Sequence, residues 1–335
     1  MLLGSTVRVV RILVGLLSVL SLAPTHIGSG DSVQPRDTES VINTIRPALP
    51  DGVRVSIVGA DTFVRLESDG VRVEVHGYDD EQYLRISAEG VVEINDASMT
   101  TVLNGDRYGN VDVTNVDTSG IPKWRVIGTN GVAMWHDHRS HWMSPKPPAA
   151  IDEDGKVLDW DIPMIIAGTR TMVSGTLYIR DKASVAWWLF GLPAIFLAVV
   201  LALTRRRLFL WLAAVASVKG IIVGYLEFTG LPADARITPV LMMFSAGALV
   251  ISAMAIATSR RDGRHHVAVS LNAGAGVALV IVAWLCVDQI RAAYVPGIEW
   301  PWMARATLPS LMGIGLVSAI DGVTRILRPP QEKIA

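Results

Sequence analysis

The sequence predicts an extracytoplasmic all-β, sandwich-like domain followed by an α-helical transmembrane bundle of five spans. Two observations support this prediction. Apolar residues make up 50% and charged residues 18% of the 335-residue chain, and the apolar excess is concentrated after residue 182. The more polar stretch before it alternates apolar and polar residues with the two-residue period of a half-buried strand.

Short alternating segments fill the region between residues 53 and 180. The clearest one places Val71, Val73 and Val75 on one face of a strand. The others cover residues 53–58, 62–68, 83–87, 124–127 and 171–180. Turn-forming pairs that end in glycine punctuate these segments, and no helical pattern interrupts them. Seven to nine short strands of this kind favour a sandwich or a small barrel.

Five apolar segments follow residue 182, each close to the roughly 20 residues that a helix needs to cross a hydrocarbon core of about 30 Å. They comprise residues 185–203, 208–228, 239–258, 267–287 and 306–323. We therefore expect a multi-pass protein of the cell membrane, with the lipid bilayer as its first partner. The single cysteine, Cys286, lies in the fourth segment, so the β domain has no disulfide.

A shorter apolar segment lies near the N-terminus, where Arg8 and Arg11 precede residues 12–23. A basic region, a short apolar run and then small residues are typical of a secretory signal peptide, and an uncleaved anchor is the alternative. The sequence thus predicts a signal peptide or N-terminal anchor over residues 1–25, the extracytoplasmic β domain over 26–183, the transmembrane domain over 184–328 and a cytoplasmic tail over 329–335.

Arginine is distributed unevenly among the segments that connect the predicted spans. The loops at 204–207 and 259–266 and the tail after Asp321 are rich in it, whereas the alternate loops at 229–238 and 288–305 contain only Arg236, Arg291 and Arg305. The positive-inside rule places the arginine-rich set in the cytoplasm. The β domain is then extracytoplasmic and the C-terminus cytoplasmic.

Three of the seven histidines lie within six residues: His136, His138 and His141. If residues 132–138 form a strand, His136 and His138 point to the same face of it. A turn directly after His138 would bring His141 back toward them, so that three imidazole nitrogens could reach one ion. Neutral imidazole is a good ligand for zinc and for copper, so the cluster predicts one of these ions as the cofactor.

Three further residues could add to this site. Met134 or Met143 would favour Cu(I) if its sulfur reached the ion. His26 would become the first residue if cleavage followed Thr25, and its α-amine and imidazole could then chelate Cu(II) together. This layout is similar to that of CopC-type copper proteins, which are also small extracytoplasmic β-sandwiches.

A metal-free interpretation explains the same residues. Histidines beside tryptophans at a strand end can bond to backbone carbonyls, with Asp137 paired to Arg139. The chain would then be an envelope scaffold that binds other envelope proteins. Convergence of three ring nitrogens on one point favours the metal, and rings directed into separate hydrogen bonds favour the scaffold. An enzyme ranks third, because no nucleophile or general base is paired with the cluster in the sequence.

The order of these parts resembles that of a family of actinobacterial membrane proteins. The motifs that carry the resemblance are Pro-Ala-Leu-Pro at 47–50, Gly77-Tyr78 followed by Tyr83-Leu84-Arg85, Asn-Gly-Asp-Arg-Tyr-Gly at 104–109, and Trp-His-Asp-His-Arg-Ser-His-Trp-Met at 135–143. The resemblance covers most of the chain. It implies the architecture and a cell-envelope location, but no activity.

Several other functional classes are disfavoured. The histidine spacing is similar to the His-x-His-x-Asp-His motif of metallo-β-lactamases, but Ser140 stands where that family has its metal-binding aspartate. No Gly-x-x-x-x-Gly-Lys pattern occurs, and the formal charge of −1 argues against nucleic acid. Neither nucleotides nor nucleic acids are therefore expected partners.

The membrane segments offer two polar candidates, Lys219 and Asn272. A polar side chain at this depth is costly unless it is paired or hydrated, which makes each a candidate for function or for a structural contact. Gly220 and Gly224 have the spacing that permits close packing of two helices.

Overall fold

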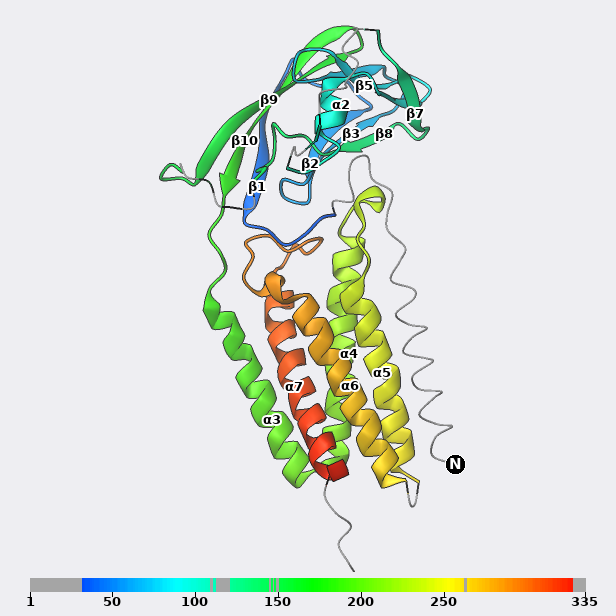
Figure 1. Ribbon diagram of the computed structural model, residues 1–335, viewed down its shortest axis with the longest axis vertical. Coiled ribbons are helices and arrows are strands. Elements are labelled where there is room, and N and C mark those ends of the chain that lie inside the picture. The colour runs from blue at the N-terminus through cyan, green and yellow to red at the C-terminus, as the bar shows by residue number, and fades with distance from the viewer. Residues whose placement is uncertain are drawn as a thin grey trace, which may run out of the picture. The chain divides into compact units, whose positions relative to one another are not determined.

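The computed structural model describes residues 32–108, 111–112, 121–144, 146, 148, 151–261 and 264–327. The described chain forms two compact units. One holds the residues up to Arg180 together with Leu231–Thr238, and the other holds Asp181–Gly230 and the residues from Pro239 on. Figure 1 shows the strands in the first unit and the long helices in the second. The predicted segment 1–25, His26 and the predicted tail 329–335 lie outside the described residues.

Two antiparallel sheets build the first unit, which confirms the predicted β class. The larger sheet has the order β1 (Thr38–Arg46), β10 (Thr169–Ile179), β9 (Lys156–Ile166), β4 (Val73–His76), β5 (Gln82–Ile86), β6 (Val92–Asn95) and β7 (Trp124–Gly128). The smaller sheet has the order β2 (Val53–Val58), β3 (Phe63–Ser68) and β8 (Val132–Trp135).

A short helix that the sequence pattern does not predict, α2 (Met99–Leu103), lies between β6 and β7. Five residues are too few to show a helical period, so only its cap is readable in the sequence: the Ser98 side chain accepts a hydrogen bond from the backbone N–H of Thr101. The helix matters for the site below, because the residue that follows it, Asn104, contacts the histidine cluster through Tyr78.

One hydrophobic core joins the two sheets, as expected for a sandwich. Alternation along the strands supplies it: Val73 and Val75 of β4 are fully buried, as are Val64 and Leu66 of β3. The Trp135 ring of the small sheet meets the Tyr83 ring of the large sheet edge to face, with 6.3 Å between centroids. Such a pair stabilises the fold by about 1 kcal/mol beyond its buried area, and it fixes the end of β8 against the core.

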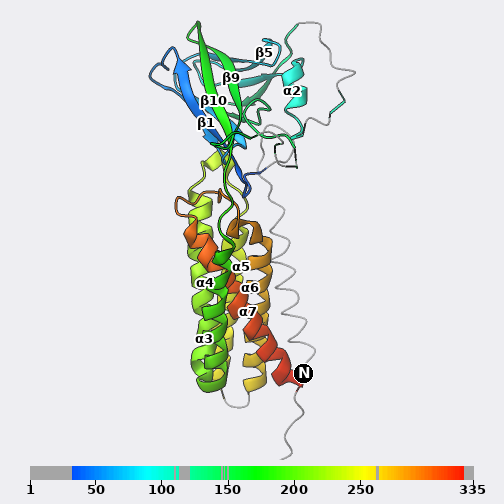
Figure 2. The same ribbon diagram turned by 90° about the vertical axis from the view of Figure 1, so that its left-hand side faces the viewer.

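Five helices of the second unit are long and apolar enough to cross a membrane, which confirms the predicted multi-pass character. The first span joins the 3-10 helix η2 (Val185–Phe190) to α3 (Gly191–Thr204), and the others are α4 (Arg206–Thr229), α5 (Val240–Ser259), α6 (His265–Leu285) and α7 (Trp302–Leu327). Figure 2 shows α3 to α7 running alongside one another. Large apolar side chains such as Phe196 and Leu203 are exposed on their outer faces, which suits contact with lipid.

The two polar candidates in the membrane segments, Lys219 and Asn272, differ in burial. Lys219 lies on the exposed face of α4, whereas Asn272 of α6 is buried and neither polar atom of its amide has a hydrogen-bond partner in the described structure.

Gly220 and Gly224 face α5: a Cβ on Gly224 would lie 2.4 Å from the backbone nitrogen of Met242. The small residues therefore allow the backbones of α4 and α5 to approach closely.

Candidate metal centre

The histidine cluster forms where the chain leaves β8. This strand ends at Trp135, so the predicted strand over residues 132–138 was too long. A turn follows, closed by the backbone N–H of Ser140 donating to the carbonyl of Asp137 at 3.0 Å. The Asp137 carboxylate supports the same turn, because it accepts from the backbone N–H of Arg139 at 3.1 Å. The turn, and not the pleat of a strand, brings the three imidazoles together.

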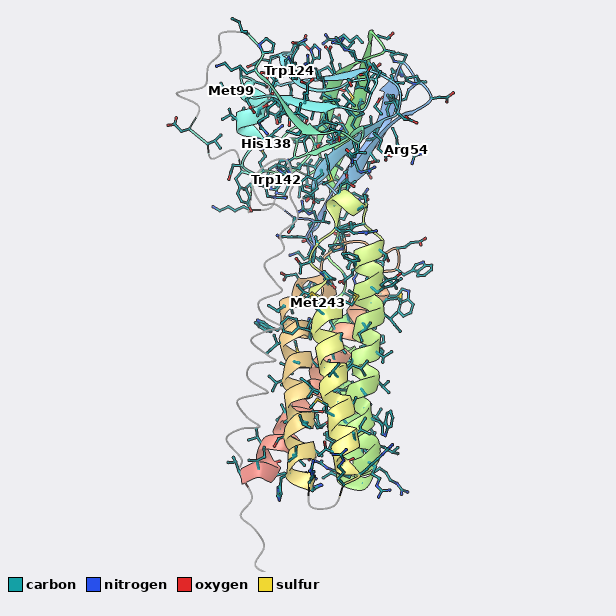
Figure 3. The ribbon with its side chains drawn as sticks, turned by 90° about the vertical axis from the view of Figure 1, so that its right-hand side faces the viewer. Arg54, Met99, Trp124, His138, Trp142 and Met243 are labelled. Atoms are coloured by element: carbon teal, nitrogen blue, oxygen red, sulfur yellow. The ribbon has the colours of Figure 1, made fainter. Side chains whose placement is uncertain are left out.

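His136, His138 and His141 each present a ligand atom, and these three atoms all lie within 4.8 Å of one another. The closest pair is His136 Nε2 and His141 Nε2, at 2.7 Å. Tetrahedral ligands about 2.05 Å from a zinc ion are separated by about 3.3 Å, so modest rotations of the rings would fit an ion between them. His136 and His141 are buried and His138 is half-buried. Among the three rings, His138, which Figure 3 labels in the β unit, is therefore the most exposed.

The second nitrogen of each ring is held by a backbone carbonyl. His136 Nδ1 lies 2.7 Å from the carbonyl oxygen of Thr62, and His141 Nδ1 lies 2.9 Å from that of Asp137. A carbonyl only accepts, so each Nδ1 carries the proton and each Nε2 presents a lone pair. Histidines that ligate a metal are usually oriented in this way. His138 uses its other ring nitrogen for this contact: its Nε2, and not its Nδ1, lies 2.8 Å from the carbonyl oxygen of Asp106.

Three hydrogen-bond acceptor atoms lie close together at the centre of the histidine cluster. The Nε2 lone pairs of His136 and His141 face each other, and the carbonyl oxygen of Arg107 lies 3.1 Å from His141 Nε2. Three acceptors at these distances repel one another unless a proton or a metal ion lies among them. A bound metal ion, or a proton held between the two nitrogens, would relieve this repulsion.

The two buried imidazoles stay neutral at physiological pH. Burial, together with the neighbouring His141, lowers the pKa of His136 to about 2. Burial likewise lowers the pKa of His141 to about 4, against the opposing effect of its hydrogen bond to the carbonyl of Asp137. Neutral imidazole is the form that binds a metal, so protons compete weakly for these ligands at pH 7.

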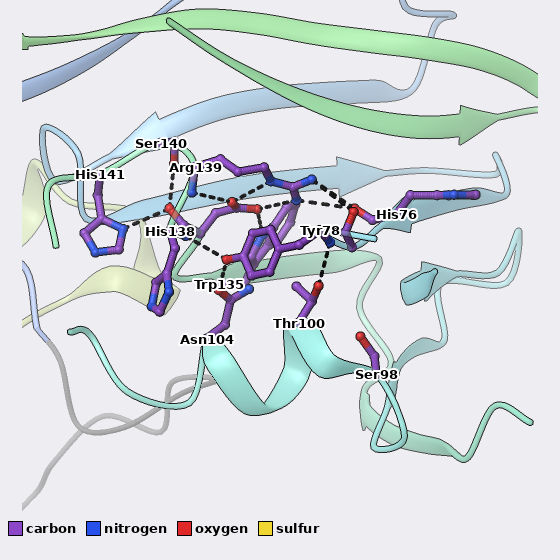
Figure 4. A network of polar contacts seen from close by, with 12 residues as sticks. His76, Tyr78, Ser98, Thr100, Asn104, Trp135, His138, Arg139, Ser140 and His141 are labelled. Atoms are coloured by element: carbon purple, nitrogen blue, oxygen red, sulfur yellow. Dashed lines mark hydrogen bonds and ion pairs between the residues drawn. The ribbon is translucent and has the colours of Figure 1, made fainter. Parts of the chain in front are cut away.

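Asp137 holds the turn through its carboxylate, whose partners Trp135 and Arg139 are labelled in Figure 4. Its fully buried carboxylate accepts from Trp135 Nε1 at 2.9 Å and from Arg139 Nη2 at 2.8 Å. Burial opposes ionisation of this group, but the Arg139 guanidinium and these hydrogen bonds hold the pKa of Asp137 below its usual value. The predicted pairing of Asp137 with Arg139 is thus present, and it orients the chain between two histidines.

Tyr78 and Asn104 connect the cluster to the rest of the β unit. The Tyr78 hydroxyl accepts from the backbone N–H of His138 at 2.9 Å and donates to the Asn104 side chain. The Arg139 guanidinium lies over the Tyr78 ring, 4.9 Å from its centroid. Tyr78 and Asn104 belong to motifs noted in the sequence, where no role could be assigned to them. Their contacts with the turn give those motifs a physical role.

The structure leaves the other predicted ligands without a demonstrated role. Met134 lies on β8 opposite Arg65 and is buried, and Met143 is exposed after the turn. Whether either sulfur joins the site stays a prediction, as does the part of His26. The carbonyls of Thr62, Asp106 and Arg107 were not predicted, because a backbone acceptor leaves no signal in the residue type.

Comparisons with protein-family models, with curated proteins and with solved structures found no match for this chain. No family is identified, so the resemblance to actinobacterial membrane proteins and to CopC-type copper proteins stays a prediction. Any conclusion about function therefore depends on the geometry of the histidine cluster and on the membrane helices.

Proposed function

We propose that the β unit binds one transition-metal ion, copper or zinc, through His136, His138 and His141, and that this membrane protein handles or senses that metal at the cell envelope. The observation that supports this most is the convergence of three ligand nitrogens, two of them with lone pairs fixed by carbonyls on the opposite ring nitrogen. A metal ion relieves the repulsion among these acceptors and uses all three rings.

The ligand type narrows the choice of ion. Three neutral imidazoles suit Zn(II) and Cu(II), and a methionine sulfur from Met134 or Met143 would shift the preference toward Cu(I). Three protein ligands leave the fourth position of a tetrahedral site for water or for another molecule. His138 is half-buried, so the cluster is more accessible at this ligand than at the two buried ones. These features favour an ion that exchanges over one that is sealed into the fold.

The arginine pattern of the connecting loops supports an extracytoplasmic β domain and a cytoplasmic C-terminus. We therefore infer that the metal comes from outside the cytoplasm and that the helices anchor the domain or pass the ion or its signal on. The division into a leader or anchor over residues 1–25, a β domain over 26–183 and a membrane domain over 184–328 belongs to the same proposal.

One observation favours a second function. Every ring of the cluster has a nitrogen on a backbone carbonyl, and Asp137 is paired with Arg139, so the turn has internal support without a metal. In that case the β unit is a metal-free scaffold that binds other envelope proteins. The two functions differ in one measurable property, which is affinity for a metal ion.

Affinity measurements on single variants test the proposal. The full chain, purified in detergent, is titrated with Zn(II), Cu(II) and Cu(I) in competition with chromophoric chelators. Loss of one of three ligands in His138→Ala should weaken binding by at least the roughly 10- to 100-fold that losing a hydrogen-bond partner of a ligand costs. His76→Ala, a histidine of the same unit outside the cluster, should bind as the wild type does. Equal affinity of His138→Ala and the wild type for every ion would refute the three-histidine site.

A further inference from the structure

Glu227 is a buried acid in the helical unit, and no basic side chain among the described residues pairs with it. The residue lies in the last turn of α4 and is 4% exposed. Its Oε1 atom has no hydrogen-bond partner in the described structure. An unpaired carboxylate is unfavourable away from water, and either a proton or a bound cation would neutralise it.

Gln289 contributes a second unsatisfied oxygen at the same place. It belongs to the 3-10 helix η4 (Val287–Ile290), is 5% exposed, and its side chain is within hydrogen-bonding reach of Glu227. Its Oε1 also has no partner among the described residues. A proton on Glu227 would neutralise the carboxylate and could be donated to the Gln289 oxygen, so protonation is the alternative that the test must exclude. A cation bound between the two residues satisfies both oxygens.

The backbone around these side chains also favours a cation. Glu227 lies at the C-terminal end of α4, and Gln289 follows the C-terminal end of α6, which is Leu285. The C-terminal end of a helix carries partial negative charge on carbonyls that lack helical partners. Two such ends therefore meet beside a carboxylate, an arrangement that is unfavourable for the carboxylate alone and favourable for a bound cation.

The loop after η4 closes over Glu227. Gly297 has a φ of +66°, and a Cβ there would lie 2.1 Å from the carbonyl oxygen of Glu227. A Cβ on Gly230 would in turn lie 1.8 Å from the carbonyl oxygen of Gly297. Only glycine permits this contact between two backbones. The loop thus packs against the end of α4 and brings the carbonyl oxygen of Gly297 next to it.

We propose that Glu227 and Gln289 bind a monovalent metal cation, with sodium as the probe, where the C-terminal ends of α4 and α6 meet. One carboxylate balances one positive charge, whereas a divalent ion would leave net charge inside the bundle. Carboxylate and amide oxygens are hard ligands that suit an alkali cation better than copper or zinc. Carbonyls at helix C-termini coordinate sodium in other membrane bundles. This site is independent of the histidine cluster.

Thermal unfolding of the full chain in detergent tests this site. EDTA is present to keep transition metals away from the histidines, and sodium chloride replaces choline chloride at constant ionic strength. The wild type should show a saturable rise of several degrees in its midpoint with sodium. Glu227→Gln should lose this rise. Glu299→Gln, which removes an exposed carboxylate from the same unit, should keep it.

Direct binding of ²²Na⁺ to the wild type keeps the test decisive if Glu227→Gln does not fold. Bound ²²Na⁺ that unlabelled sodium displaces, and that choline does not, is the expected result. Absence of such binding, or a sodium response in Glu227→Gln equal to that of the wild type, would overturn the proposal. A neutral, protonated Glu227 with no sodium bound would then explain the buried carboxyl.

Discussion

Asp137 shows how a residue that binds no metal can determine the geometry of a site. Its carboxylate holds Trp135 and Arg139, while its backbone carbonyl accepts from Nδ1 of His141. We expect Asp137→Asn to lower the free energy of unfolding by about 3 kcal/mol, because it removes a fully buried carboxylate and leaves the half-buried Arg139 without its counter-charge. Chemical denaturation followed by tryptophan fluorescence measures this loss.

Asp159 supplies the control for that variant. It forms an exposed ion pair with Lys156 in the same unit, and such pairs contribute little. Asp159→Asn should therefore change the free energy of unfolding much less than Asp137→Asn does. Equal effects of the two substitutions would mean that the buried pair does not support the turn.

Acid should destabilise the metal-free protein. Burial lowers the pKa of His136 to about 2 and that of His141 to about 4, whereas an unfolded histidine titrates near 6.5. Below pH 6.5 the unfolded chain therefore binds protons that the folded chain does not. Each of these imidazoles then removes about 1.4 kcal/mol from the free energy of unfolding per pH unit, until the pH approaches its folded pKa.

Denaturant unfolding in EDTA between pH 7.5 and pH 5 measures this dependence. The wild type should lose stability steadily over the acid half of that range. A His136→Asn, His141→Asn double variant should have a flatter profile, since it lacks both groups. A wild-type profile as flat as that of the double variant would show that the two imidazoles are not buried in neutral form.

At the scale of elements, the β7–β8 turn sets the position of the cluster. Gly131 has a φ of +68°, and a Cβ there would lie 2.3 Å from the carbonyl oxygen of Ser68. The register that follows places Trp135 opposite Val64, one residue before the first histidine. Gly131→Ala should thus both destabilise the fold and weaken metal binding, because it displaces the end of β8.

Gly168 provides a matched comparison. It has a φ of +79°, but nothing lies within 4 Å of a Cβ built there. Gly168→Ala should cost only the roughly 1 kcal/mol of left-handed backbone strain and should leave metal affinity unchanged. Unfolding and metal titration of both variants test this difference. A larger loss of affinity in Gly168→Ala than in Gly131→Ala would contradict the role given to the β7–β8 turn.

Periodicity predicted elements better than it predicted their ends. The alternation of Val73 and Val75 with Glu74 identified β4, whose pattern is buried, half-buried, buried. The same reasoning extended β8 to His138, because alternation does not show that the Asp137 side chain will fold back onto Trp135 and Arg139. Long apolar runs located all five spans, but α7 begins at Trp302, ahead of the apolar core that predicted it.

At the scale of the whole molecule, the pattern of apolar residues indicated a β domain followed by five membrane helices, because long apolar runs and two-residue alternation are distinct signals. The histidine site was only partly predictable. Its ligands are close in sequence, whereas the carbonyls of Thr62 and Asp106 and the Tyr78 hydroxyl come from segments 30 or more residues away. Tertiary contacts of that kind need the fold.

The proposed orientation makes a prediction for intact cells. In a Cys286→Ser background, a cysteine at the exposed position Glu153 of the β unit should react with a membrane-impermeant maleimide. A cysteine at Arg260, in the arginine-rich loop after α5, should react only after the membrane is permeabilised. The opposite labelling pattern would place the β unit in the cytoplasm and remove the case for an envelope function.

The most direct test of the metal centre is the metal content of the full chain, purified in detergent after equilibration with copper or zinc. The wild type should hold one ion per chain, and the triple His136, His138 and His141→Ala variant should hold none while keeping the circular dichroism of a folded protein. A folded wild type that binds neither ion would contradict the metal centre and would leave the histidines as supports of a metal-free scaffold.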